Sequence, residues 1–98
     1  MQVIARRTLR EFWEREPHAE MLLRVWYALV TKASWAGPWD IKAQFGTTVD
    51  FVGDNRVIFD IGGNNYRLVV RVSYQFKQVL VKFVGTHADY DKIDPEAV

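Results

Sequence analysis

Regular spacing of apolar residues predicts two helices in the first part of the chain. Between positions 19 and 33, apolar side chains recur at intervals of three and four, which is the repeat of one helical face. A shorter helix is expected to begin at Thr8, because Thr8 and Glu11 have the spacing of a capping box. It should end near Glu16, since Pro17 disfavours helical geometry in the residue before it. The apolar stripe of the longer helix comprises Ala19, Leu22, Leu23, Trp26, Leu29, Val30 and Ala33.

Shorter apolar runs separated by turn residues predict the strands of a sheet. A brief strand is expected at Gln2–Ala5, and the others follow the helices. Gly62–Asn65 should close a hairpin, because glycine and asparagine tolerate positive φ. The segment from Ala36 to Thr48 is expected to be an irregular connection, since Ala36-Gly37-Pro38 ends the helical pattern. The later strands are expected at 49–53, 56–61, 66–74 and 78–84.

This order of elements predicts an α+β fold, with a short N-terminal strand and two N-terminal helices packed on a small, mostly antiparallel sheet. The face of the sheet without helices should be free, concave and polar. Alternation along the strand 66–74 directs Tyr66 and Leu68 toward the core, and Arg67 and Arg71 toward the free face. A short helical turn is expected after the last strand. The final residues, Asp94–Val98, are expected to fray.

Composition limits the functions that the chain can have. With 98 residues, 49% hydrophobic and 14% aromatic, it is expected to form one domain over residues 1–98. Cysteine is absent, which excludes disulfides, thiolate nucleophiles and cysteine-ligated metals. No apolar run approaches the roughly 20 residues that span a bilayer, and the N-terminus lacks a signal-peptide pattern. We therefore expect a cytoplasmic protein without a membrane partner. A net charge of +1 means that attraction to nucleic acid must come from local clusters.

A polar cluster near the C-terminus is the first candidate for chemistry. His87, Tyr90 and Asp91 share one face if the chain is helical after Thr86. Histidine exchanges protons near neutral pH, and Asp91 could orient its ring. The alternative is structural: Thr86 caps a helical turn while Tyr90 packs on the sheet. The residues alone favour the structural interpretation. His18, the other histidine, has no ligand-spaced partner, so neither a metal nor another cofactor is expected.

The second candidate is the pair of arginines on the free face. A guanidinium group matches phosphate oxygens in a bidentate way, so Arg67 and Arg71 could clamp a phosphate. Equally, Asp60 across the hairpin could pair with one of them. Asn64 lies in a turn that hairpin geometry alone explains, although such a turn can also contact a ligand. Lys42, just beyond Trp39, is more typical of a surface lysine.

Two stretches resemble the HigB toxin family of bacterial HigBA toxin–antitoxin modules. They are GGNNYRLVV in the hairpin and KFVGTHADYDKI at the end of the last strand. The resemblance extends to the VIARRTL start, the helical hairpin and Lys42 before the sheet. It implies a RelE-like fold, with two N-terminal helices packed on a small antiparallel sheet.

The resemblance also implies an activity and partners. It implies the toxin of a type II toxin–antitoxin system, a ribosome-dependent mRNA endonuclease that cleaves through the 2′-hydroxyl without a metal. Such a toxin inhibits translation until its antitoxin neutralises it. The implied partners are mRNA on the ribosome, ribosomal RNA and a HigA-like helix-turn-helix antitoxin. Operator DNA would be contacted only through the antitoxin. The antitoxin would cover the arginine face or bind the exposed side of the helical hairpin.

Transferred to this chain, the family pattern assigns roles to the candidates. His87 becomes the principal acid or base, Tyr90 its hydrogen-bonding or acid partner, and Arg67 the stabiliser of charge on the phosphate. The expected substrate-binding residues are Lys42, Asn64, Arg71 and Asp91. The alternative function is a non-catalytic module that binds RNA or protein through the Arg67 and Arg71 face.

Overall fold

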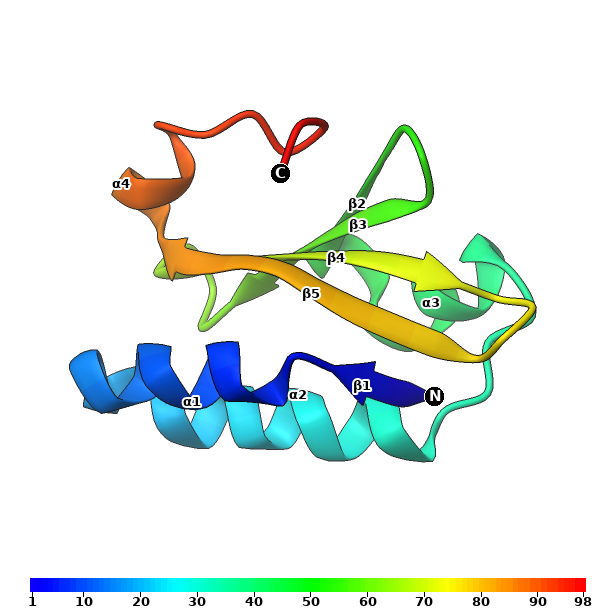
Figure 1. The fold of residues 1–98 in the computed structure, drawn as a ribbon, viewed down its shortest axis with the longest axis horizontal. Helices are drawn as coiled ribbons and strands as arrows, with labels where there is room; N and C mark the ends of the chain where they lie inside the picture. The colour runs from blue at the N-terminus through cyan, green and yellow to red at the C-terminus, as the bar shows by residue number, and fades with distance from the viewer.

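The computed structural model describes residues 1–98 and confirms the predicted α+β class (Figure 1). One sheet has the strand order β1-β5-β4-β3-β2, in which only the pair of β1 and β5 is parallel. No helix is long and apolar enough to cross a membrane. In chain order the elements are β1 (Gln2–Ile4), α1 (Arg6–Arg15), η1 (Pro17–Ala19), α2 (Glu20–Lys32), α3 (Pro38–Phe45), η2 (Gly46–Thr48), β2 (Val49–Val52), β3 (Arg56–Ile61), β4 (Tyr66–Ser73), β5 (Gln78–Thr86) and α4 (His87–Tyr90).

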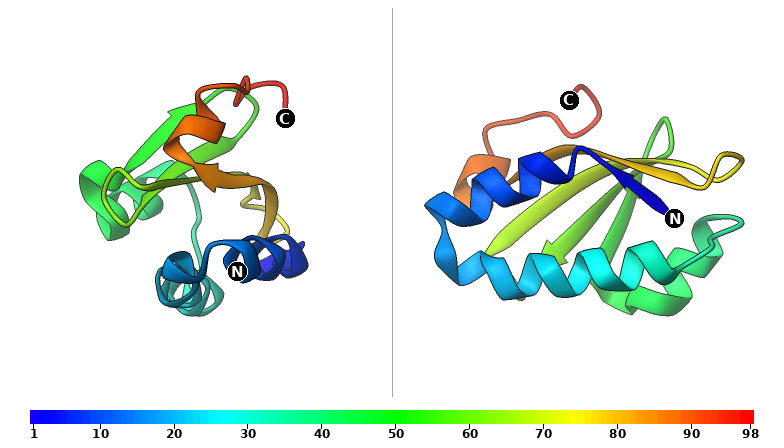
Figure 2. Two further views of the ribbon diagram at one scale, coloured as in Figure 1. Left: turned by 90° about the vertical axis from the view of Figure 1, so that its left-hand side faces the viewer. Right: turned by 60° about the horizontal axis from the view of Figure 1, so that its bottom comes forward.

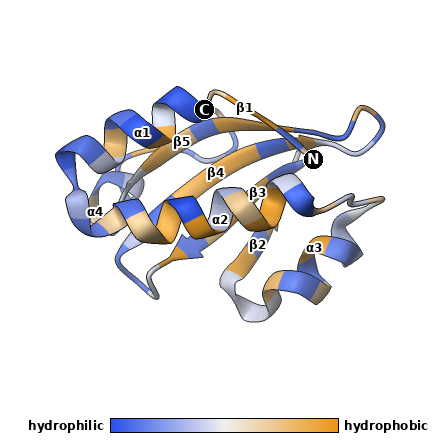
Figure 3. Cartoon of the chain, turned by 90° about the horizontal axis from the view of Figure 1, so that it is seen from below, coloured by the Kyte–Doolittle hydropathy of each residue, from blue (hydrophilic) through white to orange (hydrophobic).

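The helices and the C-terminal segment lie on opposite sides of the sheet. α1 and α2 lie below it in Figure 1, whereas α4 and the residues after it lie above, and the turned views of Figure 2 agree. The main core of 21 buried residues fills the space between the sheet and the helices. Seen from the helix side, apolar strands lie behind α1 and α2 (Figure 3). Burying each large side chain contributes roughly 1.5–3 kcal/mol before entropy is counted.

The start of α1 differs from the prediction. The helix begins at Arg6 instead of Thr8, and no side chain caps it, so the predicted capping box is wrong. Ala5 has a φ of 69°, which turns the chain directly from β1 into the helix. Glu11, expected to reach back to Thr8, instead pairs with Arg7 at 2.8 Å. The predicted end of the helix is confirmed, because α1 stops at Arg15 and Pro17 opens η1.

The apolar stripe of α2 is wider than the surface that the sheet covers. Leu23, Trp26 and Val30 are buried as predicted. Leu22 and Leu29 were expected in the core but are 38% and 44% exposed. Helical spacing identifies an apolar face but not how much of it a neighbour covers, which explains this error.

α3 was not predicted. Pro38 was interpreted as the end of helical structure, but it occupies the first turn of a new helix, where its missing N–H costs nothing. The Asp40 carboxylate accepts a hydrogen bond from Ala36 N at 2.7 Å and holds the chain at the helix start. Ile41 is fully buried, and the Phe45 ring packs 4.9 Å from that of Phe59.

The strands lie close to their predicted positions, with one irregularity. β5 continues to Thr86 rather than ending at Val84. Val69 pairs with Phe83 and Val70 with Val81, so Lys82 has no partner and forms a bulge. The bulge reverses the alternation of β5. Val81 and Val84 therefore both reach the main core, whereas Phe83 faces the other side.

The face opposite the helices is neither fully polar nor free, contrary to the prediction. Arg67 and Arg71 do lie there, but Ile58 and Val69 between them are only 5% and 0% exposed, although they lie outside the main core. α4 and the C-terminal segment cover this face (Figure 1). The segment is ordered rather than frayed, because Arg56 donates from Nη2 and Nε to the backbone oxygen of Val98 at 2.7 and 3.2 Å.

Candidate active site

The position of α4 is set by hydrogen bonds at both ends of its first turn. Thr86 and Asp89 form a capping box: Asp89 N donates to Thr86 Oγ1 at 3.1 Å, and Thr86 N to Asp89 Oδ2 at 3.3 Å. His87 N donates to the Asn65 oxygen at 3.0 Å and ties α4 to the β3–β4 hairpin. The structural interpretation of Thr86 is therefore confirmed, and the cap places His87 and Tyr90 over the end of β4.

Gly85 allows α4 to pack this closely, and sequence reasoning missed it. A Cβ atom here would lie 2.6 Å from Phe83 Cζ and 3.0 Å from Asp89 Cβ. Gly85 pairs with Arg67 across the sheet, directly beneath the candidate site. A glycine inside a strand often marks a close approach of another segment, which is the signal that could have identified it.

Arg67 is buried and held by three neighbours. Its Nε lies 3.2 Å from Asp60 Oδ1, its Nη1 donates to the Tyr66 oxygen at 3.1 Å, and its Nη2 donates to Asn64 Oδ1. The pairing with Asp60, which the sequence left as an alternative, is confirmed. A guanidinium has five N–H groups, so two remain for a ligand. Only 11% of the Arg67 side chain is exposed, so a ligand can reach those donors only from the exposed side.

Tyr90 lies within the electrostatic influence of both Arg67 and Asp60. Burial raises the pKa of the Tyr90 hydroxyl; the Arg67 charge lowers it, and the charges of Asp50, Asp60 and Asp91 raise it. The ring also lies 6.5 Å from that of Phe83. A hydroxyl whose pKa exceeds 10 is protonated at neutral pH. Tyr90 can therefore donate a hydrogen bond or a proton here, but it is poorly suited to act as a base.

His87 and Asp91 form a pair on the outer side of α4. His87 Nδ1 lies 3.2 Å from Asp91 Oδ2, as their spacing predicted, and the histidine side chain is 42% exposed. A carboxylate at Nδ1 fixes the ring and leaves Nε2 to exchange a proton with a ligand. A histidine, a tyrosine and an arginine from α4 and β4 thus occupy one end of the sheet.

Two predicted residues lie away from this cluster. Arg71 is four residues along β4 from Arg67, about 13 Å at roughly 3.3 Å per residue, and its Nη2 lies 3.0 Å from Asp54 Oδ1. Lys42 is exposed on α3, which packs beside β2 at the edge of the sheet, whereas α4 packs on β4 and β5. A role for Lys42 in substrate binding stays a prediction.

Known proteins align with almost the whole chain. The mRNA interferase HigB of Escherichia coli O6:H1 (strain CFT073) is 26% identical over 94 residues, which are 95% of this chain and 91% of that protein. The mRNA interferase toxin HigB of Escherichia coli K12 is 27% identical over 92 residues, covering 93% and 88%. The mRNA interferase HigB of Shigella flexneri matches to the same extent.

A family model described as HigB toxin, the RelE-like toxic component of a toxin–antitoxin system, matches residues 19–93. That range includes Arg67, α4 and the strands that position them. The chain therefore belongs to the HigB toxin family, as its two sequence stretches indicated.

Proposed function

We propose that this protein is an endoribonuclease toxin that cleaves mRNA, acting as one domain over residues 1–98. The observation that carries the proposal is the position of α4 at the end of β4, where Arg67 acts on the pKa of Tyr90 and the His87 backbone bonds to the β3–β4 hairpin. Support comes from the family, whose relatives in Escherichia coli and Shigella flexneri are named mRNA interferases. Translation would stop because its template is cut.

The proposed reaction uses the RNA's own 2′-hydroxyl as nucleophile. His87 Nε2 takes the hydroxyl proton as the 2′-oxygen attacks the adjacent phosphorus. The bond from phosphorus to the 5′-oxygen breaks, Tyr90 protonates that oxygen, and a 2′,3′-cyclic phosphate remains. Arg67 directs its two remaining N–H groups at the charge that develops on the phosphate. Asn64 and Asp91 act through their partners, since each binds one of these side chains.

The proposed partners are translating ribosomes and an antitoxin of the HigA-like helix-turn-helix type, which would also connect the toxin to operator DNA. With a net charge of +1, contact with ribosomal RNA must come from local positive clusters rather than from the field of the whole protein. For the antitoxin, the exposed side of α2 is the better supported surface, because Met21, Val25 and Leu29 are 70%, 50% and 44% exposed there. Leu29→Glu should then weaken antitoxin binding and leave cleavage intact, as measured by pull-down and primer extension.

The test is cleavage of a defined mRNA in a translation extract, mapped by primer extension, with and without ribosomes. The proposal expects cuts that need ribosomes and that disappear when the cleaved nucleotide carries a 2′-deoxyribose. Cleavage of the deoxy-substituted message would refute the 2′-hydroxyl mechanism. The alternative is a non-catalytic module that binds RNA or protein through the Arg67 and Arg71 face. It predicts binding without cleavage under any of these conditions.

A further inference from the structure

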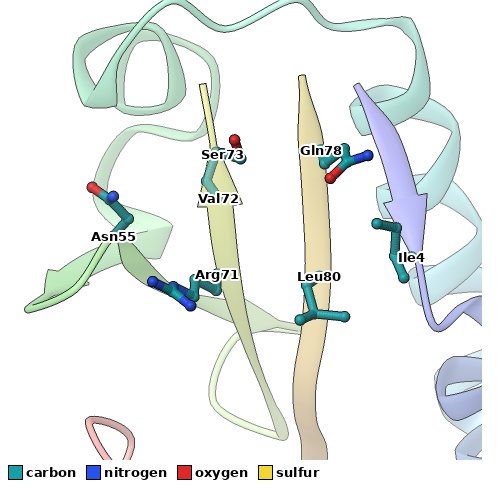
Figure 4. A pocket seen from close by; sticks show the side chains of 7 residues that line it. All are labelled: Ile4, Asn55, Arg71, Val72, Ser73, Gln78 and Leu80. Carbon is teal, nitrogen blue, oxygen red and sulfur yellow. The ribbon is translucent and has the colours of Figure 1, made fainter. Parts of the chain in front are cut away.

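A hollow of about 340 Å³ lies on the same face of the sheet as Arg67, at the opposite end (Figure 4). Arg71 and Ser73 come from β4, Gln78 and Leu80 from β5, and Ile4 from β1. Strand pairing sets Ile4, Leu80 and Arg71 in one row across three strands. Asn55 and Val72 complete the lining. The hollow is therefore part of the sheet itself rather than a gap between loops.

The lining combines an apolar floor with unused amide groups. Ile4 is 36% exposed beside Leu80, which gives a flat apolar surface. The side-chain amides of Gln78 and Asn55 make no hydrogen bond within the chain, and each offers two donors and an acceptor. Arg71 adds a positive charge that its exposed partner Asp54 neutralises only in part. An apolar face, a polar edge and a nearby negative charge are the properties of a nucleotide.

A strip of apolar side chains connects this hollow to the candidate active site. Phe83 lies beside Tyr90, with 6.5 Å between ring centroids. Because of the bulge at Lys82, the next residue of β5 on this face is Leu80, which pairs with Ile4. Successive bases of a single strand commonly stack on such aromatic and apolar positions.

We propose that this hollow, lined by Ile4, Leu80, Gln78 and Arg71, binds the base of an RNA nucleotide that flanks the cleaved bond. Gln78 reads the polar edge of the base, Leu80 and Ile4 contact its face, and Arg71 binds the neighbouring phosphate. The proposal rests on the proposed endoribonuclease function and makes the hollow a source of sequence preference. About 13 Å along β4 separates Arg67 from Arg71, so the base belongs to another nucleotide than the one attacked.

The test compares Gln78→Leu with Gln75→Leu, a matched control on the same hairpin that does not line the hollow. Cleavage sites are mapped on one mRNA pool in a translation extract, and the base preference at each flanking position is determined. Gln78→Leu should lose the preference at one flanking position by roughly fivefold or more, with unchanged preference in the control. Identical preferences in both variants and the wild type would overturn the subsite.

A second readout does not depend on cleavage. Nuclear magnetic resonance of the ¹⁵N-labelled protein is followed while each of the four nucleoside 5′-monophosphates is added. Saturable shifts at the Gln78 side-chain amide and the Leu80 backbone, reduced in Gln78→Leu but not in Gln75→Leu, support the subsite even if no mRNA is cut. Absence of saturable shifts for all four nucleotides contradicts it. Failure of the wild type to cleave would count against the proposed function alone.

Discussion

The two faces of the sheet bury neighbouring valines in different ways. Val70 faces α1 and α2 within a core of 21 residues, whereas Val69 faces α4 and the C-terminal segment, with Ile58 as the other buried apolar residue outside that core. The helix side is closed by long elements with many apolar contacts. The other side is closed by one helical turn and a segment held largely by Arg56. One face therefore provides stability, and the other can carry charged groups, a hollow and a site.

The largest expected effect compares the two valines directly. Val70→Ala should lower the free energy of unfolding by roughly 2–3 kcal/mol, since two buried methyl groups are lost from a rigid core. Val69→Ala removes the same atoms, but the C-terminal segment can settle into the space, so the loss should be roughly half as large. Denaturant unfolding measures both. Equal losses would mean that both faces are equally rigid.

Gly85→Ala should disturb only the face that carries the site. The new methyl group would clash with Phe83 and Asp89, and such overpacking typically costs 1–3 kcal/mol. Because the methyl group would displace α4 from the sheet, the rate of mRNA cleavage should fall even though the protein remains folded. Gly53→Ala is the matched control, because a Cβ atom there meets nothing within 4 Å. If Gly85→Ala cleaves as well as Gly53→Ala, the position of α4 is not critical.

Arg56→Gln tests the attachment of the C-terminal segment. Loss of the bonds to Val98 should lower stability by roughly 1 kcal/mol and increase amide exchange at Ala97 and Val98, whose N–H groups bond to the Asp94 oxygen. Arg7→Gln, which loses an exposed pair on α1, should change neither exchange rate. Hydrogen exchange read by mass spectrometry measures this. Unchanged exchange in Arg56→Gln would show that the segment is held by other contacts.

The smallest expected effect concerns pH. Burial raises the pKa values of Tyr90 and Tyr74 above 10, so the folded state holds these protons more tightly than the unfolded state does. The resulting stabilisation is complete below pH 10 and is lost as the pH rises through the folded-state pKa values. Tyr90→Phe should remove from the absorbance titration a phenolate transition whose midpoint lies above pH 10. A lost transition centred at or below pH 10 would contradict the raised pKa of Tyr90.

The sequence predicted those features that repeat or that lie close together along the chain. Helical spacing identified α2, alternation identified the faces of β4, and Gly62–Asn65 identified the hairpin. The spacing of His87 and Asp91 also predicted their contact, because one helical turn is enough to form it. The family resemblance then indicated that these neighbours belong to a site, which spacing alone did not show.

Other features depend on contacts between single residues far apart in sequence. The bond from Arg56 to Val98 crosses 42 positions, and no local pattern announces it. The bulge at Lys82 is visible only in the pairing of β4 with β5. The sequence therefore did not show which face of the sheet Phe83 occupies. Pro38 was interpreted wrongly because proline is common both after the end of a helix and in the first turn of one. The burial of Ile41 in α3 shows that Pro38 begins a helix here.

The most direct test of the central claim is the rate of ribosome-dependent mRNA cleavage by His87→Ala relative to His18→Ala. Both variants lose one exposed histidine side chain, but only His87 lies in the α4 cluster; His18 lies in η1. His87→Ala should cut roughly 10²-fold more slowly or worse, since a general acid or base contributes about that much, while His18→Ala should match the wild type. Equal rates for the two variants would contradict the assignment of the active site to this face of the sheet.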